Sequence, residues 1–361
     1  MKALNYLGLI TLTALTMSSC SNDEIVPNTM PQNVIEFGIY LGRDAQTRGT
    51  TSDAPTLTNF GVFAYYTGSV AYTTASFAPN FMYDQLVEWT SNDNTRNYAP
   101  EKYWPNDVND KISFFAYAPH QEEHVAIVTG HGQADDPKIN FYVDRTTKKQ
   151  IDLLWAEEAN RVKQPMDHTV QFEFHHALSR IAFCVESIID EANEDGTNTA
   201  DEATTVKVKQ VRLIGNFANA GTLNLNGGGW HNASQTTTAY TLNPDNFNDV
   251  ANAVGTLKTQ LNKDDSYLMI LPQKATCKIE VTYDVITKDD ALSGGYSIIS
   301  NVITSNDFVF NFVQGAAYSF CLHLGMTSVK FDAKVNEWVT NWDKDEVADI
   351  AVHVPLNSQV L

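Results

Sequence analysis

The sequence predicts an all-β protein built from two antiparallel β-sandwich domains. Phe and Tyr occur 18 and 15 times in 361 residues, and such aromatic side chains are enriched in strands. Apolar and polar residues alternate over short segments, which are separated by clusters of Gly, Pro, Asn and Asp. Long runs of Ala, Leu, Glu and Lys are missing, so helices are not favoured. Many short strands with turn signals between them are typical of sandwiches.

The first 19 residues are predicted to be a lipoprotein signal peptide. An apolar run, residues 7–17, follows Lys2 and is too short to span a bilayer. It leads into Ser18-Ser19-Cys20, the pattern of a bacterial lipobox, in which Cys20 takes a diacylglycerol and becomes the first mature residue. Residues 21–24 are acidic and resemble the surface-export signals of Bacteroidetes-type lipoproteins. We therefore expect a lipid anchor in the outer membrane, facing outward; the alternative is an ordinary signal with an incidental Cys.

Residues 20–48 are expected to form a lipidated propeptide that includes the first strand. A polar tether leads to residues 33–41, where period-two spacing places four apolar side chains on one face: Ile35, Phe37, Ile39 and Leu41. A polar loop follows, and loops of this kind are where proteolytic nicking occurs. Small residues from Gly49 onward make Arg48 a suitable cleavage site, whereas Arg43 precedes an Asp. The alternative is that Arg48 is an ordinary surface residue.

The two domains are predicted to meet near Pro165. The N-terminal domain takes residues 49–164, together with strand 33–41 in the precursor, and has further strands at 60–66, 111–118, 139–143 and 151–155. The C-terminal domain takes residues 165–361, with strands at 170–188, 206–214, 222–225, 267–271, 278–286, 308–312, 317–324 and 328–335. Residues 92–105 and 120–137 are expected to be loops, and residues 226–230, Asn-Gly-Gly-Gly-Trp, a hairpin turn.

Composition and motifs exclude several classes of function. A net charge of −19 argues against nucleic-acid binding, which needs a basic surface. No hydrolase, metalloprotease, phosphate-binding or dinucleotide-binding motif is present, so we expect no enzyme, no catalytic residue and no cofactor. The pair His175-His176 is tempting, but neighbouring residues of a strand point to opposite faces and cannot chelate one metal ion together.

Three cysteines besides Cys20 lie inside apolar, strand-like segments: Cys184, Cys277 and Cys321. Their odd number and the lack of a Cys-x-x-Cys spacing predict neither a disulfide framework nor a zinc site. We expect buried free thiols that pack as small apolar side chains. A single bridge among the three is the alternative.

A series of short motifs runs in order along almost the whole chain. These are the lipobox with its acidic tail, Thr47-Arg48-Gly49, Tyr103-Trp104-Pro105, and residues 57–65, 112–119, 152–156, 172–181, 267–272, 281–283 and 317–325. Taken together they resemble the fimbrillins, the type V pilins of Bacteroidales. The resemblance implies two transthyretin-like β-sandwich domains and a lipoprotein precursor carried to the cell surface. There an arginine-specific protease removes the chain up to an Arg after the first strand, and the groove receives a C-terminal donor strand from another subunit.

The end of the chain has a pattern that suits such a donor. Segment 349–356 places four apolar side chains at period two, as the first strand does: Ile350, Val352, Val354 and Leu356. Fully burying four such side chains contributes about 6–12 kcal/mol, which is comparable to the stability of a whole domain. The alternative is that this segment closes its own domain as an edge strand, where Pro355 is tolerated.

We therefore expect a structural subunit of a surface fimbria that supports adhesion and binds other copies of itself or related fimbrial subunits. A tip or anchor adhesin of the same fibre is one alternative. Another is a surface lipoprotein that never polymerises and binds host or bacterial glycans or proteins. A flat platform of exposed aromatic side chains would favour this last alternative; residues 64–72 and the surroundings of Trp230 are the candidate places for it.

Overall fold

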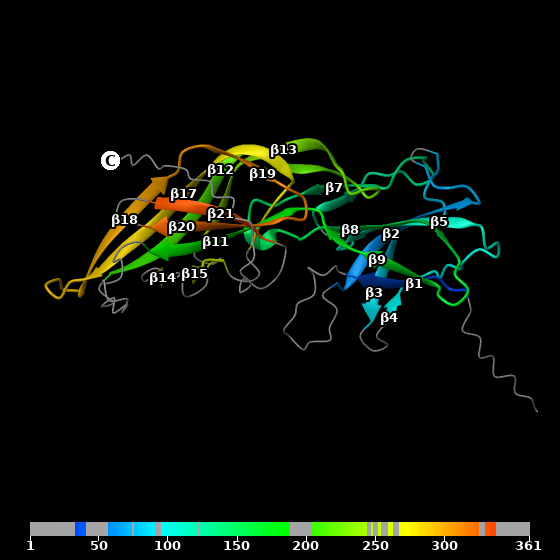
Figure 1. Cartoon of the computed structure of the whole chain (residues 1–361), viewed down its shortest axis with the longest axis horizontal. Helices are drawn as coiled ribbons and strands as arrows, with labels where there is room; N and C mark the ends of the chain where they lie inside the picture. The colour runs from blue at the N-terminus through cyan, green and yellow to red at the C-terminus, as the bar shows by residue number, and fades with distance from the viewer. Residues whose placement is uncertain are drawn as a thin grey trace, which may run out of the picture.

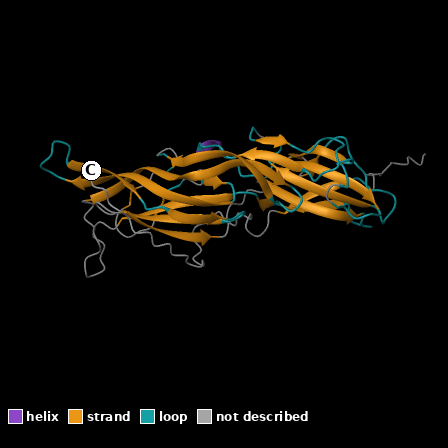
Figure 2. Cartoon of the chain, turned by 90° about the horizontal axis from the view of Figure 1, so that it is seen from above, coloured by secondary structure: helices purple, strands orange, loops and turns teal. Residues whose placement is uncertain are grey.

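The computed structural model describes residues 33–40, 57–73, 76–90, 95–121, 123–187, 204–243, 247, 252–253, 259–262, 267–324 and 329–336. These residues form an elongated, almost entirely β structure, which confirms the predicted all-β class (Figure 1). Within them a single turn of 3-10 helix, Thr147–Lys149, interrupts the strands, as Figure 2 shows in purple. No helix of the described part has the length and apolar character needed to cross a membrane.

The first sandwich lies at the right-hand end of Figure 1 and contains a six-stranded and a two-stranded sheet. The larger sheet is antiparallel, in the order β10 (His175–His176), β8 (Leu154–Val162), β5 (Lys111–Ala118), β2 (Asn59–Gly68), β3 (Met82–Thr90) and β4 (Thr95–Asn97). The smaller sheet pairs β1 (Glu36–Tyr40) with β9 (Thr169–Glu173) in parallel. Its buried side chains and those of β2 and β5 form one apolar cluster between the two sheets.

The second sandwich packs an eight-stranded sheet against a five-stranded one. The larger sheet contains β6 (Val125–Ile127), β7 (Lys138–Tyr142), β12 (Thr204–Asn224), β13 (Trp230–Leu242), β14 (Asn252–Ala253), β17 (Gln273–Lys288), β18 (Tyr296–Thr304) and β19 (Phe308–Phe312). The smaller one contains β11 (Ser179–Ser187), β15 (Thr259–Gln260), β16 (Leu268–Ile270), β20 (Ala317–Leu324) and β21 (Val329–Asn336). Side chains such as Phe183, Leu213 and Phe320 fill the space between them.

The chain does not pass from the first sandwich to the second at a single point near Pro165. β7, which the sequence assigned to the N-terminal domain, pairs with β12 of the second sandwich. β9, which lies beyond Pro165, pairs with β1 of the first. The two halves therefore exchange strands between residues 125 and 176. Alternation along the chain locates a strand, but it carries no information about which sheet the strand joins.

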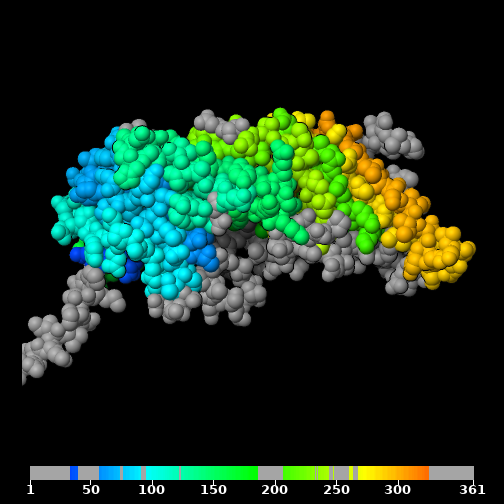
Figure 3. All heavy atoms as spheres, turned by 180° about the vertical axis from the view of Figure 1, so that it is seen from behind, coloured from blue at the N-terminus to red at the C-terminus, as the bar shows by residue number. Residues whose placement is uncertain are grey.

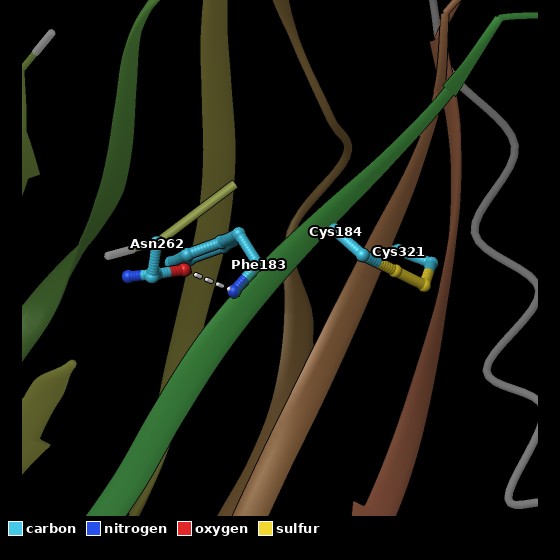
Figure 4. The surroundings of a disulfide bond; sticks show 4 residues. All are labelled: Phe183, Cys184, Asn262 and Cys321. Atoms are coloured by element: carbon cyan, nitrogen blue, oxygen red, sulfur yellow. Dashed lines mark hydrogen bonds between the residues drawn. A yellow bond between two sulfur atoms is a disulfide. The ribbon is translucent and has the colours of Figure 1, made fainter. Parts of the chain in front are cut away.

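Two of the three cysteines are bonded, which corrects the expectation of free thiols. Cys184 and Cys321 form a disulfide with their Cα atoms 4.4 Å apart (Figure 4). They occupy directly opposed positions on β11 and β20, which are parallel neighbours. The alternative expectation, a single bridge among the three cysteines, is therefore confirmed. The register of β11 and β20 brings together two residues that are 137 positions apart in the sequence. Cys277 is free and buried, and burial raises the pKa of its thiol to about 12.

Candidate functional site

Strand β1 lies in a groove of the first sandwich and is held there along both edges. On one edge, five residues from Glu36 to Tyr40 pair in parallel with β9. On the other edge, the chain around Tyr103 contacts the start of β1: Ile35 N donates to Lys102 O at 2.9 Å, and Trp104 N donates to Asn33 O at 2.8 Å. The strand is thus an integral layer of the sandwich.

The inward-facing side chains of β1, and that of Ile35 directly before it, enter an aromatic pocket. Ile35 is 0% exposed and Phe37 is 6% exposed. The Phe37 ring stacks on Phe172, with centroids 5.8 Å apart, and three further rings meet it edge-on: Tyr98 at 5.3 Å, Phe114 at 6.0 Å and Phe60 at 6.1 Å. Aromatic pairs in these arrangements add stability beyond their buried area. Phe37 is therefore the central anchor of the strand.

Two polar side chains of the groove hold main-chain atoms in place. The Tyr98 hydroxyl donates to Ile35 O at 2.8 Å, and burial raises the pKa of Tyr98 to about 12. Trp104 Nε1 donates to His168 O at 2.9 Å, while Glu36 N donates to the same carbonyl at 3.2 Å. These bonds satisfy main-chain groups on both sides of β1, as a buried strand requires.

Two outward-facing positions of β1, Glu36 and Gly38, are polar or small, in line with period-two alternation. Glu36 is exposed, and Gly38 lies opposite Gln171 of β9. A Cβ at Gly38 would meet the Gln171 amide, which is the far end of a flexible side chain. The inner face therefore carries the apolar contacts of the strand, and the outer face adds little to them.

The structure places three of the four predicted first-strand residues. Ile35, Phe37 and Ile39 contact the apolar cluster, while Leu41 lies outside the described residues. Cys20, Arg48 and Gly49 also lie outside them, as do Ile350, Val352, Val354 and Leu356. Lipidation, cleavage and strand donation consequently stay predictions.

The walls of the groove were only partly recognisable in the sequence. Phe172 belongs to a predicted strand, but Tyr98 and Trp104 come from a segment expected to be a loop. Their signals in the sequence are that large aromatic residues flank Pro100 and Pro105 in a segment otherwise rich in Asn and Asp, and that Trp104 lies in the motif Tyr103-Trp104-Pro105.

The two neighbouring histidines, His175 and His176, make separate contacts and do not form a common site. His176 Nδ1 contacts Asp152 Oδ2 at 2.9 Å, whereas the His175 ring lies 5.3 Å from that of Trp155. Among the described residues, no three His, Cys, Asp or Glu side chains gather as a metal site.

The aromatic segments named as glycan candidates pack largely inside the protein. Tyr65 is buried, Tyr72 lies against Phe115, and Trp230 Nε1 donates to Ala177 O at 2.8 Å. The exposed aromatic residues of the described part, Tyr66, Tyr103 and Tyr296, lie on separate elements and form no platform.

Comparison with known proteins places this fold in a family. The profile of the fimbrillin-like family matches residues 47–338. The fimbrium subunit Fim1C of Phocaeicola vulgatus is 26% identical over an alignment of 388 positions, which covers 95% of this chain and 98% of that protein.

Among solved structures, a protein of Bacteroides uniformis assigned to cell adhesion is 18% identical with a TM-score of 0.44, over 85% of this chain and 99% of that one. The fimbrial anchor protein Mfa2 of Porphyromonas gingivalis is 10% identical with a TM-score of 0.35, over 89% and 99%. Since the family profile matches most of its length, from residue 47 to residue 338, the chain belongs to the fimbrillin-like family.

Proposed function

We propose that this chain is a fimbrial subunit in which β1 is a replaceable strand. As a family member it is a structural subunit of a cell-surface fimbria and associates with other fimbrial subunits. The observation that carries the proposal is the position of β1. The strand fills an aromatic groove, yet it lies on the N-terminal side of the arginine-containing loop, so one cut at Arg48 would separate it covalently from the rest of the fold.

Removal of β1 would leave a groove that strongly favours binding of another strand, because the contribution of β1 to stability would be lost. Burying Ile35 and Phe37 contributes about 3–6 kcal/mol together, at about 1.5–3 kcal/mol for each side chain. Loss of the strand would uncover Phe172, Phe60 and Phe114 and leave the main chain of β9 unpaired on that edge. Exposed apolar surface and an unpaired strand edge both favour association with another strand.

The C-terminal segment of another copy is the occupant that we propose. Ile350, Val352, Val354 and Leu356 share one face of an extended chain, as Ile35, Phe37, Ile39 and Leu41 do. Aligned in that order, Val352 takes the place of Phe37. Because Val is smaller than Phe, the four rings around this position would have to close in on it.

The maturation steps belong to the same proposal. Lipid on Cys20 would hold the precursor in the outer membrane, and an extracellular arginine-specific protease would cut between Arg48 and Gly49. The role is structural and requires no catalysis by the chain itself. Adhesion to host or bacterial glycans or proteins would be a property of the assembled fibre.

A pair of neighbouring substitutions tests the donor step. Val352→Asp would bury an unpaired carboxylate in the partner's groove and should abolish polymerisation, whereas His353→Asp, on the opposite face, should be tolerated. Polymer yield on purified, protease-treated protein is the measurement. Equal yields for the two variants would contradict the proposed pairing.

A further inference from the structure

Strand β18 forms an outer edge of the eight-stranded sheet, at the end of the molecule away from β1. Of the strands that the structure describes, it pairs with β17 alone. The pairing is unbroken from Lys288 opposite Tyr296 to Glu280 opposite Thr304. The tip of this hairpin, gold at the right of Figure 3, forms that end of the described part.

This edge lacks the features by which proteins usually prevent edge-to-edge association. β18 contains nine residues, with no charged side chain, no Pro and no bulge. Shortness, charge or bulges usually protect such an edge. Several other outer strands do have such protection: β4, β6, β10 and β15 have two or three residues each, and the β12–β13 pairing is interrupted by bulges. The outer strand β19 lacks charge and bulges as well, but it is shorter, with five residues.

The side chains and the main chain of β18 are both presented outward. Ile298 and Val302 are 61% and 63% exposed. Ser305 N donates to Ile279 O, and Asp289 N donates to Gly295 O, so odd-numbered residues make the bonds at both ends of the ladder. Antiparallel pairs alternate between bonded and non-bonded positions. The N–H and C=O groups of the even-numbered residues, from Tyr296 to Thr304, therefore point to the free edge.

We propose that β18 pairs with β18 of a second copy of this chain, antiparallel and about a two-fold axis at Ser300. This register sets Ser300 opposite its own counterpart, Ile298 opposite Val302 and Tyr296 opposite Thr304. All of these are even-numbered positions, so their main-chain groups are already aligned to bond. The exposed side chains of Ile298 and Val302 in each copy then cover those of the other, which is the self-complementarity that a two-fold interface requires.

Electrostatics also favours a second copy as the occupant. A net charge of −19 opposes association between copies over most of the surface. On β17, the neighbour of β18, however, the two carboxylates are paired: Asp284 with Lys209 at 3.1 Å, and Glu280 with Arg212 at 2.7 Å. The middle of the edge is thus locally neutral, and Asp289, Asp290 and Asp307 lie only in the connections at its two ends.

A cysteine substitution at the proposed two-fold axis tests the proposal. The experiment uses the full chain, displayed on intact cells. In the proposed register the Ser300 Cα atoms lie about 5.5 Å apart, which is within disulfide range. Under mild oxidation, most Ser300→Cys protein should run at twice the monomer mass on a non-reducing gel. Val309→Cys is the matched control, because Val309 is 57% exposed on β19 but lies beyond the paired segment. The native cysteines of the fold cause little background, since Cys184 and Cys321 are bonded and Cys277 is buried.

A second set of variants tests the register. In the Ser300→Cys chain, Val302→Glu should reduce the dimer band several-fold, and adding Ile298→Lys should restore it, because the two new charges face each other across the axis. No dimer from Ser300→Cys, equal dimer from Val309→Cys, or no restoration by the charge pair would overturn the proposal.

Discussion

Removing the Phe37 ring should release β1 from its groove while leaving the rest of the protein folded. Phe37 is 6% exposed and packs against four aromatic rings, whose centroids lie 5.3–6.1 Å from its own. Large-to-small changes of this kind cost about 3–5 kcal/mol. The buried side chains of β1 contribute about 3–6 kcal/mol, so Phe37→Ala removes much of what holds the strand.

Hydrogen exchange is the suitable assay, because global unfolding of two sandwiches is not a two-state process. A loss of about 3 kcal/mol corresponds to roughly a 100-fold increase in the open population. Amides of residues 33–40 and of β9 should therefore exchange about 100-fold faster in the uncleaved Phe37→Ala protein, while those of β12 and β17 stay unchanged.

Glu36→Ala is the matched control for this prediction. It changes an exposed side chain of the same strand, and surface substitutions stay within about 0.5 kcal/mol, or roughly twofold in exchange rate. Unchanged exchange in Phe37→Ala, or an equal rise in all strands, would refute the view that β1 is a locally detachable layer anchored by one ring.

Further predictions concern the junction between the halves and the cysteines. Gly228 has a φ of +65°, and an added Cβ would collide with the Trp155 ring, whereas Gly227 has a φ of +81° with no atom within 4 Å. Gly227→Ala should therefore cost about 1–2 kcal/mol for the backbone alone, and Gly228→Ala clearly more; equal Tm values would contradict this packing. Reduction of Cys184–Cys321 should lower the Tm of the native chain by the equivalent of about 2–5 kcal/mol and leave a Cys184→Ser/Cys321→Ser double variant unaffected. Because its raised pKa keeps Cys277 protonated near pH 8, a thiol reagent should label Cys277 only after denaturation; labelling of the native protein would show that this thiol is accessible.

Alternation along the sequence located the strands that bury one face. Segment 308–312, for example, is β19 with buried Phe308, Phe310 and Phe312, as its period predicts. Three long strands were not predicted, β3, β13 and β18. The β18 segment has apolar residues on both faces because its edge position buries neither face fully, so no clear period of two results.

The pairing of distant strands could not be read from the same pattern. β12 is one strand of 21 residues, although its sequence suggested two separate segments, since bulges near Ile214 and Ala220 shift the alternation. The Cys184–Cys321 bond and the walls of the β1 groove likewise depend on which strands are neighbours. For the groove, the sequence therefore predicted the apolar face of β1, but not Tyr98 and Trp104, which contact it from another segment.

The groove and the β18 edge are two open-edge problems with different solutions. In the groove, the chain supplies its own strand, which keeps the aromatic pocket of Phe60, Phe114 and Phe172 covered; in the proposed function a partner strand would later replace it. An uncovered pocket of this kind would promote aggregation during export, because it combines apolar surface with an unpaired edge. At β18 the exposed side chains form no aromatic cluster and the carboxylates of the neighbouring β17 are paired, so an uncovered edge is less hazardous for a single copy. Association through the groove would therefore wait for removal of β1, whereas association through β18 requires only that two copies meet.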